Sequence, residues 1–128
     1  MKRIILEMGM GNDLYGEDYT KAACRAVDDA LHHSSLILFR SLGFDHQDME
    51  VRVTIAVQEP EKVEVPIVAA KLPRGVPYVK VVHGGLDVVD CAHDTKSVIA
   101  TAAVEAYLDI DESRWIQSPS GVLGSPER

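Results

Sequence analysis

The stretch that decides the fold is Gly9-Met10-Gly11-Asn12-Asp13-Leu14-Tyr15-Gly16-Glu17-Asp18-Tyr19-Thr20-Lys21. It joins an apolar run to a long amphipathic segment, and its three glycines allow the backbone to double back because glycine adopts positive φ without steric cost. We predict a strand over residues 3–8, a glycine-rich loop, and a helix that starts near Asp18. Two interpretations of the loop stay open: it lines a ligand site, or it is a bent connection whose acids cap the helix.

The predicted helix, residues 18–38, has an apolar stripe in which small side chains dominate, so we expect another element to pack closely against it. Lys21 and Arg25 lie four residues apart near the helix N-terminus, where like charges repel and the macrodipole disfavours cations. A compensating acid, Asp13 or Glu17, or a ligand would resolve this conflict. The stripe consists of Ala22, Ala23, Ala26, Val27, Ala30 and Leu31.

The rest of the chain gives clear strand patterns and one ambiguous segment. Residues 49–58 predict a strand, since branched apolar residues occupy every second position. Residues 60–72 predict a shorter helix that Pro66 interrupts, and residues 76–89 predict one or two strands with a bend at Gly84-Gly85. Residues 96–108 fit either type, because their alanines favour helix and their alternation favours strand.

Length and charge restrict the function classes. The 128 residues fit one domain, which we place at residues 1–110, followed by a mobile tail or an arm laid on a neighbour at residues 111–128. The net charge of −7 argues against nucleic acid and anionic membrane surfaces as partners. No apolar run is long enough for a signal peptide or a membrane span. We therefore expect a cytoplasmic protein with two reduced cysteines.

The candidate site centres on the glycine-rich stretch and the helix start. Lys21 would act as a cation or, if deprotonated beside Arg25, as a base or nucleophile. Asp13 would orient it, and His32 would transfer protons near neutral pH. Amide or imine hydrolysis is the mildest chemistry that fits these catalytic candidates. The predicted ligand-binding residues are Gly9, Gly11, Asn12, Gly16, Asp18, Thr20, Arg25, His83, Gly84 and Gly85.

We expect neither a cofactor nor a bound metal, because the chain contains no dinucleotide or phosphate-loop motif. A divalent-metal site at Asp13, Asp18 or His46 is the third alternative. The pair Cys91 and His93 offers too few ligands for a zinc site.

A resemblance is carried by Gly9-x-Gly11-x-Asp13-x-x-Gly16-x-Asp18-x-Thr20-Lys21-Ala22-Ala23, with Asp29-Ala30-x-His32-His33-x-Ser35, Leu72-Pro73-x-Gly75, Gly84-Gly85-Leu86 and Ala102-Ala103-Val104. Over about residues 3–108 the chain resembles a small family known only as conserved hypothetical proteins. The resemblance implies a compact α/β domain whose last segment is a strand, and no established reaction. More loosely, the layout looks like the repeated unit of ring-opening cyclic-amide hydrolases and of trimeric enamine deaminases. The hydrolases use a Ser–Lys pairing, and their serine motif has no counterpart here.

Together these patterns predict an α/β (α+β) fold: a four-stranded mixed sheet with two helices on one face, in the order β-α-β-α-β-β. The second face, with Arg52, Thr54, Ala56 and Gln58, suggests burial against another subunit, so we predict a homo-oligomer. We expect a homo-oligomeric binder or hydrolase of a small polar molecule. The alternative is a non-catalytic assembly or regulatory module.

Overall fold

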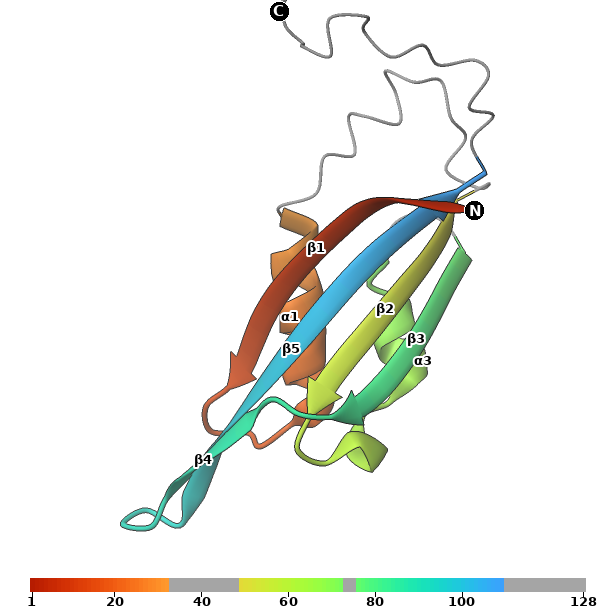
Figure 1. Cartoon of the computed structure of the whole chain (residues 1–128). Coiled ribbons are helices and arrows are strands. Elements are labelled where there is room, and N and C mark those ends of the chain that lie inside the picture. Colours follow the sequence, from red (N-terminus) through yellow and green to blue (C-terminus); the bar gives the residue numbers. More distant parts are fainter. Residues whose placement is uncertain (33–48, 73–75, 110–128) are drawn as a thin grey trace, which may run out of the picture.

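The computed structural model describes residues 1–32, 49–72 and 76–109 (Figure 1). Along the chain these residues form a strand, a helix, a second strand, two short helices and three further strands. In order, the elements are β1 (Lys2–Asp13), α1 (Tyr19–His32), β2 (Glu50–Val57), η2 (Pro60–Lys62), α3 (Val65–Ala69), β3 (Val76–His83), β4 (Leu86–Asp90) and β5 (Thr95–Leu108). No described helix is long and apolar enough to cross a membrane.

The strands form one mixed sheet around β5. The order is β1-β5-β2-β3, and β4 pairs with β5 outside this path. β2 and β3 are parallel, whereas β5 runs antiparallel to β1, β2 and β4. β4 and the start of β5 make a hairpin, residues 86–99, that projects beyond the other strands (Figure 1). We call it the hairpin arm.

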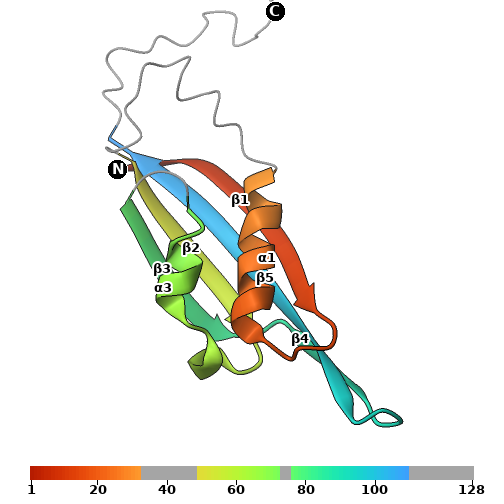
Figure 2. The same cartoon turned by 180° about the vertical axis from the view of Figure 1, so that it is seen from behind.

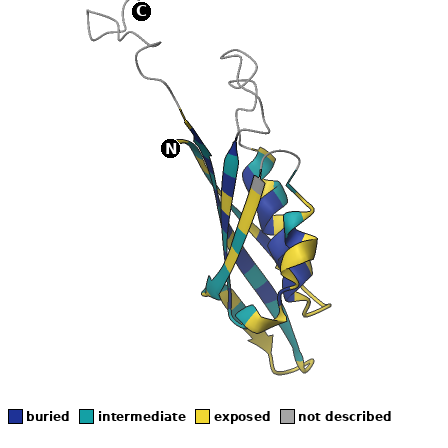
Figure 3. Cartoon of the chain, turned by 90° about the vertical axis from the view of Figure 1, so that its right-hand side faces the viewer, coloured by how far each residue is buried: buried dark blue, intermediate teal, exposed yellow. Residues whose placement is uncertain are grey.

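Both α-helices lie on one face of the sheet, as the view from behind shows (Figure 2). Alternate residues of β2 and β5 point into this covered face and are buried, while the residues between them point to the opposite, open face. Seen from the side, the buried residues gather between the sheet and the helices (Figure 3). The largest fully buried side chains are Ile55, Leu108, Val27, Val53, Val57, Val68 and Val98.

Helix α1 lies unusually close to β1, because both surfaces carry small residues. A Cβ atom at Gly9 would lie 2.4 Å from the Ala26 oxygen, and one at Gly11 would lie 2.3 Å from the Ala26 nitrogen. The alanine stripe of α1 supplies the matching surface, with Ala22, Ala26 and Ala30 fully buried. The close partner that the stripe predicts is therefore β1.

The predicted fold class is confirmed, with several changes in detail. β1 continues five residues past the predicted strand, so Gly9 and Gly11 lie in a strand rather than in a loop, and the loop prediction is wrong at these two positions. The predicted segment 60–72 forms two short helices, and Pro66 lies in the first turn of α3. Residues 76–89 form two strands, and residues 96–108 form a strand. β4 makes the sheet five-stranded instead of four-stranded.

The end of the predicted helix, residues 33–38, lies outside the described residues, as do His46 and the predicted tail.

Candidate functional site

The start of α1 is held by a chain of carboxylate contacts. The Asp18 backbone N–H donates to Asp13 Oδ2 at 3.0 Å, and the Lys21 backbone N–H donates to Asp18 Oδ1 at 3.0 Å. Arg25 donates to the Asn12 carbonyl at 2.7 Å and lies 3.6 Å from Asp13 Oδ1. Asp18 therefore caps the helix, and the buried Asp13 supplies the acid that the Lys21–Arg25 conflict requires.

The three catalytic candidates do not come together in the protomer. Lys21 lies in the first turn of α1 and His32 is its last residue, so eleven residues of helix separate them by about 16 Å. Asp13 is turned toward the Asp18 amide and Arg25. Within the residues that the structure describes, Lys21 and His32 therefore lie at opposite ends of α1.

Four predicted site residues line one groove between α1 and α3. Asp18, Thr20, Lys21 and Arg25 contribute to its wall, and its volume is about 420 Å³. The Thr20 hydroxyl is already occupied, because it accepts from the Glu64 N–H at 2.9 Å and lies 3.4 Å from the Lys62 carbonyl. The remaining lining residues are Cys24, Asp28, Glu64, Ile67 and Lys71.

His83, Gly84 and Gly85 lie away from this groove, at the connection between β3 and β4. Gly85 has φ of +64°, and a Cβ atom there would lie 2.3 Å from the Ile99 carbonyl oxygen. The Gln58 amide donates to the Gly84 carbonyl at 2.9 Å and to the Gly85 carbonyl at 3.3 Å. The predicted bend at the two glycines is thus confirmed, and these contacts give it a structural role.

A polar cluster that the sequence did not predict lies where α1, η2 and the hairpin arm meet. The Tyr19 hydroxyl lies 2.7 Å from Glu59 Oε2 and 2.5 Å from Asp87 Oδ2. Lys96 Nζ lies 2.9 Å from the same Glu59 oxygen and 3.6 Å from Asp87 Oδ2. A phenol has one proton and donates to one carboxylate at a time, so the Lys96 charge is needed to hold both acids. We call these four residues the Tyr19 cluster.

The electrostatics of the Tyr19 cluster follow from its burial and hydrogen bonds. Burial, followed by the contacts with Asp87 and Glu59, raises the pKa of Tyr19 above its ordinary value, so the phenol stays neutral. Hydrogen bonds from Tyr19, Lys96 and Lys62 lower the pKa of Glu59 to about 2. The contact with Glu59, and then that with Tyr19, raises the pKa of Lys96. The cluster therefore ties the arm to the helix layer.

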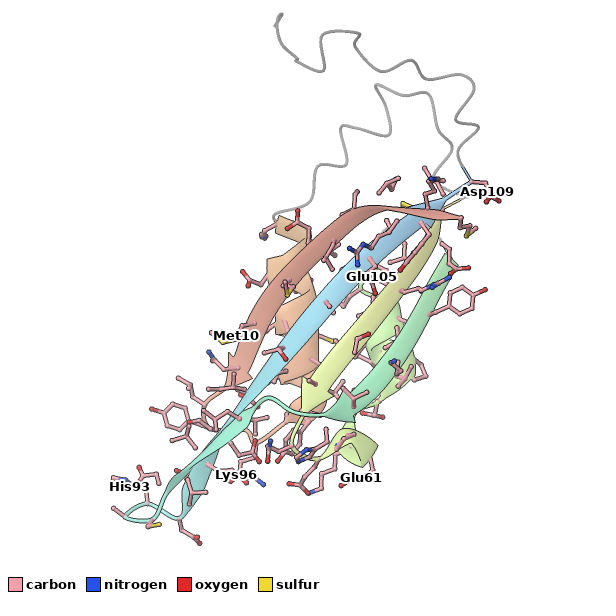
Figure 4. The ribbon with its side chains drawn as sticks, viewed as in Figure 1. Met10, Glu61, His93, Lys96, Glu105 and Asp109 are labelled. Carbon is pink, nitrogen blue, oxygen red and sulfur yellow. The ribbon has the colours of Figure 1, made fainter. Side chains whose placement is uncertain are left out.

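The open face is ordered into rows by the strand register. Leu6 of β1 lies opposite Glu105 of β5, Met8 opposite Ala103, and Met10 opposite Thr101. In β2, Arg52, Thr54 and Ala56 continue the same three rows. Tyr78, Lys80 and Val82 of β3 complete them. Figure 4 looks onto this face, with Met10 at its β1 edge and Glu105 over β5.

The middle rows combine long and small side chains. Met8 and Met10 are 68% and 58% exposed at the β1 edge. Beside them, Thr54, Ala56 and Ala103 are short, which leaves a shallow trough of about 480 Å³. The face continues onto the hairpin arm, where Leu86 pairs with Ile99 and Val88 with Ser97, and where Leu86 and Val88 are exposed.

Comparison with known proteins supplies the family. Residues 3–106 match the family described as conserved hypothetical protein (Lin0512_fam). The chain belongs to this family. A crystal structure of an FtsZ-like protein of unknown function from Nostoc punctiforme is similar, with 36% sequence identity and a TM-score of 0.75 over 85% of this chain and 97% of that chain. No protein with a curated description matches the chain.

The Lin0512 family match bears out the resemblance to an uncharacterised family, and it brings no reaction with it.

Proposed function

We propose that this protein is an assembly module whose copies form a homo-oligomer through the open face of the sheet. The proposal is carried by the exposed apolar side chains that follow one another along β1, beside a trough of small residues. These side chains are Leu6, Met8 and Met10. An apolar strip of this kind on one side of a small sheet favours burial against another surface. The open face carries both protruding methionines and a hollow, as a self-complementary interface requires.

The β1 edge supports pairing through the face instead of pairing through strand edges. The Met10 backbone N–H donates to Asp29 Oδ2 at 2.9 Å, so α1 occupies a ladder position that an added strand would need. On β3, Pro77 has no N–H to donate to an added strand. These two features disfavour simple edge-to-edge addition and support pairing through the open face.

The test compares the mass of three purified proteins by size-exclusion chromatography with light scattering. The wild type is expected to exceed the 14.0 kDa of one chain, and Met8→Asp is expected to fall to that mass because a charge would be buried in the interface. Val65→Asp is the control, since Val65 is an exposed apolar residue of α3 on the other side of the sheet. A wild type that runs as one chain at micromolar concentration would refute the assembly.

A second candidate is the binding of a small polar molecule in the groove between α1 and α3. It is favoured by the presence of Lys21, Arg25 and Asp18 on one wall, which gives charges of both signs within about 420 Å³. Thermal-shift screening of wild type and Lys21→Ala against metabolites tests it. A compound that stabilises the wild type alone would support the groove, and hydrolysis would then be assayed with amide and imine compounds. Stabilisation of both proteins by the same compounds would reject Lys21 as a ligand contact.

A further inference from the structure

A second hollow lies on the open face, between the parallel strands β2 and β3. Its volume is about 390 Å³, within the range of small-molecule pockets. Arg52, Tyr78, Lys80 and Glu105 surround it. Thr54 lines both this hollow and the neighbouring trough, so the charged pocket opens directly onto a strip of small residues.

The carboxylates around the pocket already have hydrogen-bond or ion-pair partners. Glu105 accepts from the Tyr107 hydroxyl at 2.9 Å and from Arg3 at 3.2 Å. These two contacts, Tyr107 first, hold the pKa of Glu105 below its ordinary value, so the carboxylate stays ionised and occupied. Glu50 is likewise paired with Arg52. The pocket therefore offers no spare carboxylate to an incoming cation.

Of the two cationic side chains that line the pocket, Arg52 has an ion-pair partner among the described residues and Lys80 has none. Arg52 is engaged by Glu50, and its guanidinium lies 4.1 Å from the centre of the Tyr107 ring. Lys80, by contrast, makes no hydrogen bond or ion pair with any residue in the part of the chain that the structure describes. An ammonium beside an aromatic side chain and a hydroxyl favours an anion, even though the chain as a whole is acidic.

We propose that this pocket binds an organic carboxylate with an aromatic or short aliphatic body. The carboxylate contacts the Lys80 ammonium and the Thr54 hydroxyl, Tyr78 flanks it at the mouth, and the apolar body extends over Ala56 toward the trough. In a protomer whose open face is not covered by another copy, an inorganic anion would satisfy Lys80 but leave the apolar strip exposed to water, so the body contributes affinity by burying it. The inference goes beyond assembly, because one protomer supplies every side chain of the pocket.

The experiment is isothermal titration calorimetry of the full-length chain with sodium benzoate, benzylammonium chloride and inorganic phosphate at equal ionic strength. Benzoate is expected to bind, and Lys80→Gln to weaken it about tenfold or more, the usual effect of losing a hydrogen bond to a charged group. Lys62→Gln is the matched control, because it removes the same charge from the opposite side of the molecule, where Lys62 pairs with Glu59. It should bind benzoate like the wild type.

Three other results of the titrations would overturn the pocket. Equal affinity of Lys80→Gln and Lys62→Gln would remove Lys80 from the site, and benzylammonium binding as tightly as benzoate would contradict the anion preference. Phosphate binding as tightly as benzoate would show that the apolar strip takes no part. Light scattering on the same samples separates this proposal from assembly. Loss of benzoate binding together with a changed mass in Lys80→Gln would assign Lys80 to the interface, whereas a wild-type monomer that binds benzoate through Lys80 would retain the pocket and refute assembly alone.

Discussion

The two faces of this sheet are built from the same strands but differ in the size and burial of their side chains. On the covered face, the backbone of α1 lies so close to Gly9 and Gly11 that neither position has room for a side chain. On the open face, the neighbouring Met8 and Met10 extend into solvent over a trough. Successive strand residues point to opposite faces, so the side chains at Gly9 and Gly11 are limited by α1 while that of Met10 between them is not. The covered face is fixed within one copy, while the open face is the surface that we propose for assembly.

The largest expected effect comes from adding a methyl group at Gly11, on the covered face. Gly11→Ala would place a methyl group 2.3 Å from the Ala26 nitrogen and 2.5 Å from the Ala22 oxygen, both backbone atoms that move only if the helix moves. We expect a loss of about 3 kcal/mol in the free energy of unfolding, which is the upper end of the usual cost of overpacking. Urea denaturation followed by circular dichroism measures it.

Met10→Ala is the companion variant, since it removes bulk from the next residue and the opposite face. Its backbone hydrogen bond to Asp29 is retained, and its exposed side chain should cost less than about 0.5 kcal/mol in a dissociated protomer. Any larger loss should depend on protein concentration, because it would act through assembly. If Gly11→Ala and Met10→Ala were equally and concentration-independently destabilised, the distinction between the faces would fail.

The covered face was largely predictable from the sequence, because its signals are local. Alternation over residues 51–57 indicated β2, and the alanine stripe of α1 indicated a closely packed neighbour. The identity of that neighbour was missed, since glycine serves equally in a turn and under a helix, and sequence does not say which applies at Gly9 and Gly11. Helix capping, one of the two interpretations that the sequence left open for the loop, was within reach because Asp18 and its partner lie within a few residues.

The second effect concerns the foot of the sheet, where the covered layer ends in the Tyr19 cluster. Tyr19→Phe would remove the hydroxyl that bridges Glu59 and Asp87, and we expect a loss of about 1.5–3 kcal/mol because the ring is buried and its partners are charged. Tyr107→Phe is the matched control on the open face. Its hydroxyl contacts Glu105 near solvent, so we expect less than about 1 kcal/mol. Equal losses in thermal unfolding would show that the cluster adds nothing beyond a surface contact.

The Tyr19 cluster and the open-face pocket were beyond reach of the sequence for one reason. Tyr19, Asp87 and Lys96 come from α1, β4 and β5, and Glu59 comes from the short connection before η2, so only the sheet order brings them together. In the same way, Lys80 meets Thr54 through the parallel register of β2 and β3, which no local spacing encodes. Lys21 and His32, by contrast, lie on one helix, and the helical rise between them places them at its two ends.

The smallest effect is a change in the acid limb of the stability curve. Because Tyr19, Lys96 and Lys62 lower the pKa of Glu59 from 4.5 to about 2, its ionised form favours the folded state above about pH 4.5, and this contribution is lost as the pH falls toward about 2. Melting temperatures of the wild type should therefore fall more steeply between about pH 4.5 and 2 than those of Glu59→Gln, which has no proton to take up there. Glu61→Gln, an exposed neighbour in η2, should keep the wild-type slope. If the slope of Glu59→Gln also matched that of the wild type, Glu59 would titrate alike in the folded and unfolded chains, and the hydrogen bonds of the cluster would not discriminate between them.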